Sequence, residues 1–550
     1  MATHQVFNVP EPWTGANLFA DDRALTEAVQ GAGAEPADLA RLSQLGELAG
    51  SPLAQDWGRL ANAVPPVLRT HDRYGHRIDE VEFHPAWHEL MSVAVANGLQ
   101  AAPWAPAAGK HAHLTRAAGF YLWSQVEQGH LCPISMSYAV LPALRHSPAL
   151  AEQYEPGLLS DIYDFGLRPP MSKRGLLAGM AMTEKQGGSD VRANTTWAVP
   201  AGDGSYRLTG HKWFCSAPMC DLFLVLAQAG EGLSCFLVPR LLPDGSRNPF
   251  ALQRLKDKLG NRSNASSEVE FDGTVGWLVG EPGRGVRTII DMVTMTRLDC
   301  VIGSAAVQRA ALTHAMHHTA GRSAFGVRLA DQPLMQQVLA DLAVEVDAAL
   351  QLTVRLADAV DRGETELLRI AVAAAKFWVC KRTAAVIGEA LECLGGAGYV
   401  EESPLPRYFR ESPLNSIWEG SSNVIALDVL RALGREPAAI DALTAELSVT
   451  AGADRRLDDA VAGLTVQLRD SAVDPPAALT RARLLTGLLA RTLQASLLVR
   501  AADGAGRSAI AEAFLASRVA EQPPAVFGGG LEPNQARRIL SYADLAKATG

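Results

Sequence analysis

The chain lacks the features of a secreted, disulfide-stabilised or membrane protein. Its seven cysteines are scattered over 550 residues without a Cys-x-x-Cys pair, which excludes a disulfide framework or a zinc ribbon and favours a reducing compartment. No apolar run reaches the roughly 18 residues that a membrane span needs. The N-terminus shows no basic segment followed by an apolar one. We therefore expect a soluble, cytoplasmic protein without membrane contact.

An excess of positive charge is also missing. The formal net charge is −9, which argues against a protein whose whole surface binds phosphate groups. With 48% hydrophobic and 20% charged residues, the composition is that of a folded globular chain and excludes extended disorder. Histidine pairs such as His317-His318 have no carboxylate or cysteine at ligand spacing, so we expect no metal site.

The hydrophobic pattern changes twice along the chain. Apolar residues first recur at spacings of three and four, then give way to short β-branched and aromatic runs separated by Gly, Asp and Pro, and finally return to helical periodicity in long stretches. The predicted parts are an N-terminal arm (1–40), an N-terminal α-helical domain (41–176), a middle β domain (177–282), a C-terminal α-helical bundle (283–437) and an extra helical domain (438–550). The predicted fold class is therefore mainly α with a central β domain.

Three short segments carry residues suited to chemistry. The loop MTEKQGGSDV at 182–191 combines two glycines with hydroxyl groups, which suits a ligand-binding loop or a plain turn. Arg322, in RSAFG, is a candidate phosphate ligand or a cation at a helix C-terminus. Glu419, in IWEGSSN, is a candidate general base, although Ser416-x-x-Glu419 also fits a helix capping box.

Together these segments resemble the acyl-CoA dehydrogenase superfamily. The loop at 182–191 is similar to the family's flavin-contacting motif, and HKWFCS at 211–216 follows at the usual place, with Phe214 and Ser216 where the family usually has Trp and Thr. RSAFG and the following Gln332 resemble the segment that reaches FAD across a subunit interface. ECLGGAGY at 392–399 resembles a second interface segment, with Glu392 in place of the usual Gln.

The resemblance implies a cofactor, FAD, and a set of residues around it. Thr183 and Ser216 would contact the flavin ring, and Ser189 would lie along the cofactor and substrate diphosphates. The implied FAD-binding residues are Met182, Thr183, Gly188, Ser189, Phe214, Cys215, Ser216, Arg322, Phe325, Gln332, Glu392, Gly395, Gly396, Trp418, Gly420, Ser421 and Asn423. Ser189, Trp418 and Arg297 are the implied contacts of the acyl-CoA substrate.

By the same resemblance Glu419 is the catalytic base. The α-proton of an acyl thioester is weakly acidic, so a positioned carboxylate must take it while a hydride leaves Cβ for flavin N5. Some relatives place the base at the position of Thr296, and threonine cannot take that role. We therefore expect an FAD-dependent acyl-CoA dehydrogenase whose electron acceptor the sequence leaves open.

Nearly the whole chain resembles one branch, the AidB-like flavoproteins of the alkylation adaptive response. VFNVPEPW near the start, FHPAWH at 83–88 and LKDKLGNRSNASSEVEF at 255–271 carry this likeness. It implies a homotetramer, activity on branched acyl-CoA such as isovaleryl-CoA, and a C-terminal domain that binds double-stranded DNA. The alternative function is thus a DNA-binding protective flavoprotein with residual dehydrogenase activity.

The charge of residues 441–550 bears on the DNA prediction. Eleven arginines and Lys547 stand against twelve acidic residues, a net charge of zero, whereas affinity for DNA grows with the number of phosphates that Lys and Arg neutralise. Arg518, Arg537 and Arg538 are the candidate DNA contacts, and a solvated helix surface is the other interpretation of these arginines.

Overall fold

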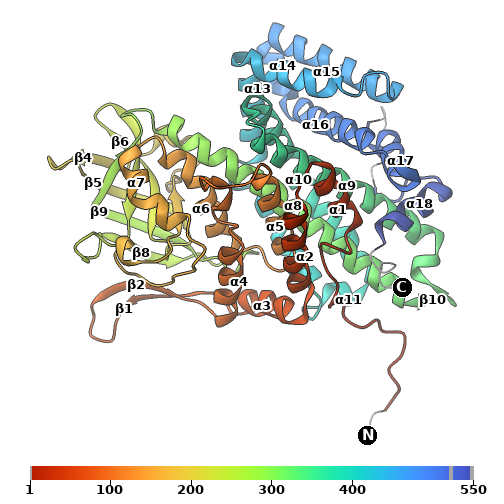
Figure 1. The fold of residues 1–550 in the computed structure, drawn as a ribbon, viewed down its shortest axis with the longest axis horizontal. Helices are drawn as coiled ribbons and strands as arrows, with labels where there is room; N and C mark the ends of the chain where they lie inside the picture. The colour runs from red at the N-terminus through yellow and green to blue at the C-terminus, as the bar shows by residue number, and fades with distance from the viewer. Residues whose placement is uncertain (1–2, 520–523, 525, 545–550) are drawn as a thin grey trace. The chain divides into compact units, whose positions relative to one another are not determined.

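The computed structural model describes residues 3–519, 524 and 526–544, and they form two compact units (Figure 1). The barrel unit comprises Leu53–Ala112 and Val126–Asp299. The bundle unit comprises Met1–Pro52, His113–Gln125 and Cys300–Gly550. Each unit is therefore built from segments that are far apart in the sequence.

The barrel unit contains a seven-stranded sheet that closes on itself. Its strands are β3 (Ala178–Ala181), β4 (Trp197–Pro200), β5 (Tyr206–Ser216), β6 (Leu222–Ala229), β7 (Gly232–Pro239), β8 (Phe250–Leu255) and β9 (Ser266–Val279). The pairings β6–β4, β4–β5, β5–β9, β9–β7 and β7–β6 form the ring, while β3 extends it beside β6 and β8 pairs with β9. The predicted central β domain is confirmed.

Helices and a hairpin complete the barrel unit. They are α3 (Pro52–Ala63), β1 (Val67–His71), β2 (Arg77–Glu82), α4 (Pro85–Ala96), η1 (Ala102–Trp104), α6 (Leu131–Leu144), α7 (Pro148–Leu158), η2 (Pro170–Ser172) and η3 (Val191–Ala193). The β1–β2 hairpin lies where the sequence predicts only helices. The Asp72 carboxylate accepts from the backbone N–H groups of Tyr74 and His76 and fixes its turn. Arg77 donates to the Leu252 carbonyl at 2.6 Å, so β8 stabilises the hairpin.

The bundle unit is helical, as predicted. Its elements are α1 (Arg23–Gly31), α2 (Pro36–Gly50), α5 (Ala112–Ser124), α8 (Gly285–Gly321, from Cys300 on), β10 (Ser323–Ala324), β11 (Val327–Arg328), η4 (Leu329–Asp331), α9 (Pro333–Asp361), α10 (Thr365–Cys393), α11 (Gly396–Tyr399), α12 (Leu405–Glu411), η5 (Leu414–Ser416), α13 (Ser422–Arg435), α14 (Pro437–Ser448), α15 (Arg455–Val473), α16 (Pro475–Arg500), α17 (Gly504–Phe514), the π-helical turn η6 (Leu515–Val519) and α18 (Pro533–Ala543). One apolar core joins α8, α9 and α10 to the C-terminal helices through residues such as Leu312, Leu342, Ile387 and Phe514.

The C-terminal helices belong to the same compact unit as the bundle. Helix α16 packs against α9 and α10, α18 packs against α9, and α14 and α15 lie beside α16 (Figure 1). Arg518 is 7% exposed and pairs with Asp341 at 2.6 Å and with Glu345 at 2.9 Å. The prediction of Arg518 as a DNA contact is therefore wrong, because its buried guanidinium forms ion pairs that join η6 to α9.

Among residues 3–519, 524 and 526–544, no helix combines the length and hydropathy that a membrane span requires. Over the same residues, no three His, Cys, Asp or Glu side chains come together as a set that could bind a metal ion.

Candidate active site

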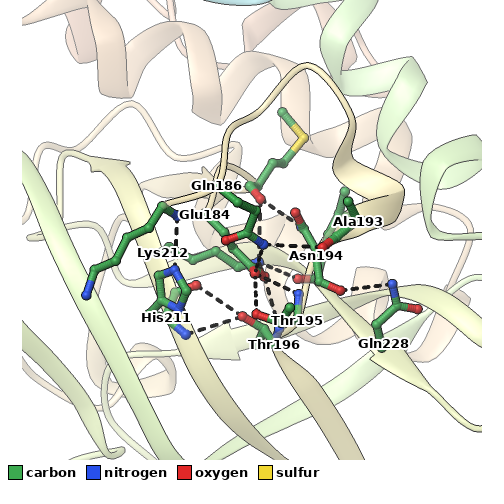
Figure 2. A network of polar contacts seen from close by, with 12 residues as sticks. Glu184, Gln186, Ala193, Asn194, Thr195, Thr196, His211, Lys212 and Gln228 are labelled. Carbon is green, nitrogen blue, oxygen red and sulfur yellow. Dashed lines mark hydrogen bonds and ion pairs between the residues drawn. The ribbon is translucent and has the colours of Figure 1, made fainter.

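A buried carboxylate organises the loop that follows β3. Glu184 is completely buried, and Lys212 Nζ donates to its Oε1 at 2.8 Å (Figure 2). Thr195 donates to Oε2 from both its N–H and its hydroxyl, at 2.7 and 2.9 Å, and the Thr196 N–H donates to Oε1 at 3.1 Å. Gln186 Nε2 adds a further bond at 2.8 Å. The Glu184 carboxylate thus accepts five hydrogen bonds from Lys212, Thr195, Thr196 and Gln186.

Lys212 is the cation of this network and comes from β5. Its ammonium group also donates to the Leu226 carbonyl of β6 at 2.7 Å, so it ties the loop to two strands. Burial would raise the pKa of Glu184, but the hydrogen bonds from Lys212 and Thr195 outweigh this and hold that pKa well below its usual range. Glu184 is therefore ionised at neutral pH and needs Lys212 as its counter-charge.

The network places Thr183 and the glycines beside it. The Trp213 N–H of β5 donates to the Thr183 carbonyl at 2.8 Å, and Asn194 Nδ2 donates to the Met182 carbonyl at 2.9 Å. A Cβ atom on Gly188 would lie 2.4 Å from Thr183 Oγ1, so only glycine lets the backbone approach this hydroxyl. Ser189 follows on the exposed part of the loop.

The end of β5 presents an aromatic ring and a hydroxyl on one face. Phe214 is 48% exposed, and Ser216, two residues further on, is partly exposed. Successive side chains of a strand alternate between faces, and Cys215 accordingly points into the barrel, where it is completely buried. Burial raises the pKa of its thiol to about 12. The buried Cys215 side chain is turned away from this face, and a cofactor contact at this position stays a prediction.

Lys256, which the sequence did not single out, lies beside this aromatic face. Its Nζ is 3.5 Å from the centroid of the Trp213 ring and 4.5 Å from that of Phe214, within cation–π range. The Glu268 carboxylate holds the same ammonium group at 2.8 Å. The only signal in the sequence is a lysine in the run LKDKLG, and such a run gives no indication of a partner some forty residues away.

A second buried carboxylate anchors the loop between β8 and β9. Glu127 is 4% exposed. It accepts from Ser263 Oγ at 2.8 Å and from the N–H of His130 at 2.9 Å, and His130 Nδ1 lies 3.0 Å away. Burial would raise the pKa of Glu127, but the contacts with His130 outweigh it and hold the pKa at about 2. The loop around Ser263 is thus fixed by an ionised group inside the barrel unit.

This geometry predicts a specific acid sensitivity. Because the folded pKa lies below the ordinary value of 4.5, the unfolded chain binds more protons between these values, and stability falls as the pH drops from about 5 towards about 2. The loss should reach about 3 kcal/mol. Urea unfolding midpoints measured between pH 3 and pH 7 should therefore depend less steeply on pH in Glu127→Gln than in the unsubstituted protein. Parallel curves for the two proteins would contradict the assignment.

In the bundle unit, Glu419 stands in a strained and firmly held turn. Its φ is +55°, a left-handed conformation that costs a non-glycine residue on the order of 1 kcal/mol or more. Lys376 of α10, 1% exposed, donates to the carbonyl of Trp418 at 2.7 Å and to that of Gly420. These carbonyls belong to the residues on either side of Glu419, so one buried ammonium holds the peptide plane that precedes Glu419 and the plane that follows Gly420.

The preceding segment is held from α8. Trp418 Nε1 donates to Asn415 Oδ1 at 2.8 Å, and Asn415 Nδ2 donates to Ser304 Oγ at 3.0 Å. The alternative interpretation of Ser416-x-x-Glu419 as a capping box is wrong, because Ser416 Oγ donates to the Pro413 carbonyl and the N-cap of α13 is Ser421. Glu419 precedes the helix and is therefore not one of its capping residues.

The segment that begins at Arg322 forms a small hairpin. Strands β10 and β11 pair at two positions, and the turn between them has positive φ at Phe325 (+54°) and Gly326 (+79°). Phe325 is 99% exposed at the tip. Gln332, the N-cap residue of α9, donates to the Ala324 carbonyl at 3.2 Å. The hairpin thus presents an aromatic side chain entirely to the outside.

The remaining predicted residues lie at helix ends. Glu392 is exposed in the last turn of α10, and Gly395, with φ +60°, separates α10 from α11, which begins at Gly396. Asn423 Oδ1 accepts from Arg483 of α16 at 2.6 Å, so its side chain also contacts a C-terminal helix. Arg297 is 8% exposed within α8, in the barrel unit.

Comparisons with known proteins cover almost the whole chain. Residues 8–165 match the family model of the adaptive response protein AidB N-terminal domain, 179–274 the acyl-CoA dehydrogenase middle domain, and 283–434 the acyl-CoA dehydrogenase C-terminal domain. The chain is 49% identical to AidB of Escherichia coli (strain K12), named as an acyl-CoA dehydrogenase, over 90% of this chain and 92% of that protein.

Two solved structures illustrate the likeness of fold. Caenorhabditis elegans ACDH-11 in complex with C11-CoA has a TM-score of 0.86 at 25% identity and covers 98% of this chain and 96% of that one. An acyl-CoA dehydrogenase from Bacillus anthracis complexed with FAD has a TM-score of 0.64 at 18% identity, with coverage of 84% and 83%.

Proposed function

Since the chain belongs to the acyl-CoA dehydrogenase family, in its AidB-like branch, we propose that it is an FAD-dependent oxidoreductase that introduces a Cα–Cβ double bond into an acyl-CoA. The braced conformation of Glu419 is the observation that carries this proposal. A backbone strained to φ +55° and bound on both sides by a buried lysine is typical of a side chain whose direction matters for function.

Glu419 is the proposed base. Its carboxylate removes the α-proton of the thioester, and the electron pair of that C–H bond forms the new double bond as the β-hydride departs. FAD, when bound, supplies the acceptor for that hydride at its N5 atom. Thr296, at the other position where relatives carry a base, has no group that takes up a proton at neutral pH.

The residues present fit a flavin. Thr183 and Ser216 offer hydroxyl groups, and the half-exposed Phe214 ring offers an apolar face. Gly188 allows the loop backbone to lie close to the Thr183 hydroxyl, since a side chain at position 188 would collide with that hydroxyl. Ser189 lies on the exposed part of the same loop and is proposed to meet the diphosphate groups.

We propose that the Arg322 hairpin serves the flavin of a neighbouring subunit in a homotetramer. The fully exposed Phe325 ring supports this, because an aromatic side chain at a hairpin tip can bury a large apolar surface against a neighbouring subunit. The guanidinium of Arg322 is suited to a phosphate oxygen. Glu392, Gly395 and Gly396 would approach the adenosine half from the end of α10.

The proposed substrate is a branched, isovaleryl-like acyl-CoA, with Trp418 shaping the acyl pocket and Ser189 and Arg297 contacting the substrate. The test is anaerobic mixing of the FAD-loaded protein with isovaleryl-CoA or with straight-chain butyryl-CoA, followed by the visible absorbance of the flavin. Bleaching that is faster with isovaleryl-CoA supports the proposal. Bleaching with neither thioester, in a protein that retains FAD, would overturn it.

Lys376 gives this proposal its first mutational prediction. Lys376→Met removes both bonds to the carbonyls around Glu419, and a misplaced base should lower kcat by about 100-fold with little change in KM. Lys376→Arg, which keeps two donors, should recover part of the rate. Lys381→Met on the same helix is the control. Equal losses in kcat and in thermal stability for Met and Arg would indicate a merely structural lysine.

The alternative, a DNA-binding protective flavoprotein, rests on fewer residues than the sequence indicates. Arg456 pairs with Asp454 at 2.7 Å, Arg500 with Glu446 at 2.5 Å, and Arg507 with Glu27 at 2.7 Å. Arg537 and Arg538 remain exposed on α18. Their exposure favours a DNA contact on this helix.

The salt dependence of DNA binding tests this alternative. Two phosphate contacts per protomer would give a slope of log K against log salt of about −2, far below that of a dedicated DNA-binding protein. Charge reversal by Arg537→Glu and Arg538→Glu should abolish such binding and leave flavin reduction unchanged. A steep slope that survives this double substitution would place the DNA contact on another surface. Arg469→Glu on α15 is the control.

A further inference from the structure

The N-terminal arm runs along the second half of α8 towards the Arg322 hairpin. The Trp13 ring stands edge-on to the His314 ring, with their centroids 5.6 Å apart. Further along, His317 Nε2 lies 2.8 Å from the Glu11 carbonyl oxygen. Both contacts lie within the bundle unit and lead the arm to the end of the helix.

There the arm meets the hairpin through one residue, Asn8. Its Nδ2 donates to the Ser323 carbonyl at 2.8 Å, and its Oδ1 accepts from the Ser323 N–H at 2.7 Å. The side-chain amide thus matches both polar groups of a strand residue, as a neighbouring strand would. The Asn8 carbonyl also accepts from Arg322 Nη1 at 3.0 Å. The φ of +57° at Asn8 is a conformation that Asn adopts more readily than most residues.

The hairpin needs such support. It has two paired positions in total, and a two-stranded hairpin of this length is at most marginally stable in water. The Arg322 side chain is long and exposed, so a free guanidinium would sample many rotamers, which costs entropy on binding. Asn8 fixes the strand and one end of that guanidinium at once, and the other N–H groups of Arg322 stay available.

We propose that Asn8 is a positioning residue for FAD: the N-terminal arm holds the Arg322 hairpin in the conformation that binds the cofactor. The inference rests on the proposed flavin contact of Arg322. The arm from residue 8 onward belongs to the segment matched by the AidB N-terminal domain model. The inference assigns this segment a role in cofactor binding, in addition to the roles of the middle and C-terminal domains.

The experiment measures FAD release from the holoprotein after dilution, by recovery of flavin fluorescence. Asn8→Gly keeps a backbone that tolerates positive φ and removes the two side-chain bonds, which should speed release about 5- to 30-fold. Deletion of residues 1–9 also removes the bond to Arg322 and should have a larger effect. Thr3→Ala, on the same arm, is the control and should release FAD at the unsubstituted rate.

A double-substitution cycle with Arg322→Ala separates the possible failures. If Asn8 acts through the hairpin, Asn8→Gly should add little to Arg322→Ala, whereas additive effects would overturn the inference. Unchanged release from Asn8→Gly and from the deletion, alongside fast release from Arg322→Ala, would overturn it and leave the flavin contact standing. Unchanged release from Arg322→Ala would remove the flavin contact and the inference together. Thermal unfolding of the apoprotein should be the same for Asn8→Gly and Thr3→Ala.

Discussion

Glutamine in place of Glu419 is expected to lower the rate of acyl-CoA dehydrogenation by about 100- to 10,000-fold, the usual contribution of a general base. The amide has nearly the shape of the carboxylate and should keep the turn that Lys376 holds, but it cannot take up the α-proton. FAD should remain bound, because no predicted flavin contact is removed. Single-turnover flavin reduction at saturating acyl-CoA, with FAD content measured on the same sample, checks both statements.

Glu402→Gln is the matched control, since Glu402 is an exposed carboxylate on the segment before α12. It should reduce flavin at the unsubstituted rate. A Glu419→Gln protein that binds FAD and still turns over within about threefold of the unsubstituted rate would place the base on another residue, because so small a loss lies well below the effect of removing a general base.

The spacing of apolar residues predicted the long helices and the strands of the barrel, because this spacing determines which face of each element is buried. The long apolar periodicities became α8, α9 and α10, and the short β-branched runs became the strands of the barrel. The β1–β2 hairpin escaped prediction, because part of its stability comes from Arg77 bonded to Leu252, a partner 175 positions away. The spacing of apolar residues along the sequence reports local structure and cannot indicate a contact between such distant residues.

The candidate site divides in the same way. Motifs pointed to Thr183 and Glu419, whose residue types match a family pattern, and to Phe214 and Ser216, which stand where the family usually has Trp and Thr. They did not point to Lys376. From the sequence, a lysine on an apolar helix is expected to extend into solvent, whereas in the structure its ammonium group donates to the Trp418 carbonyl of the Glu419 turn. Lys376 binds backbone carbonyl groups. Every residue has such a group, so the sequence does not indicate which residues Lys376 will contact.

The count of charged residues gave a partial answer on DNA binding. The net charge of zero over 441–550 already argued against a strong phosphate field. The ion pairs then show how these charges are used: Arg518 joins η6 to α9, and Arg507 joins α17 to α1 through Glu27. Arg518, which suggested nucleic acid, thus holds the C-terminal helices on the bundle, and Arg507 does the same.

Lys212→Met should strongly destabilise the barrel unit. Glu184 is fully buried, and its ionised form depends on Lys212. Removal of one partner of a buried ion pair typically costs about 3–5 kcal/mol, because the other charge is left uncompensated. The loop from Met182 to Ser189 should open so that the carboxylate reaches water, and FAD should then be lost, which gel filtration followed by flavin absorbance will show.

Two further variants decide whether the ion pair or the lysine side chain matters. In the double variant Lys212→Met with Glu184→Gln, no charge remains buried, and most of the stability should return because the penalty of the lone carboxylate is gone. Lys185→Met, an exposed lysine on the same loop, should unfold at the unsubstituted temperature. A Lys212→Met protein that melts normally and keeps FAD would show that the Glu184 network does not hold the loop. A double variant as unstable as Lys212→Met would locate the loss in the bonds to Leu226 and its strand, not in the charge.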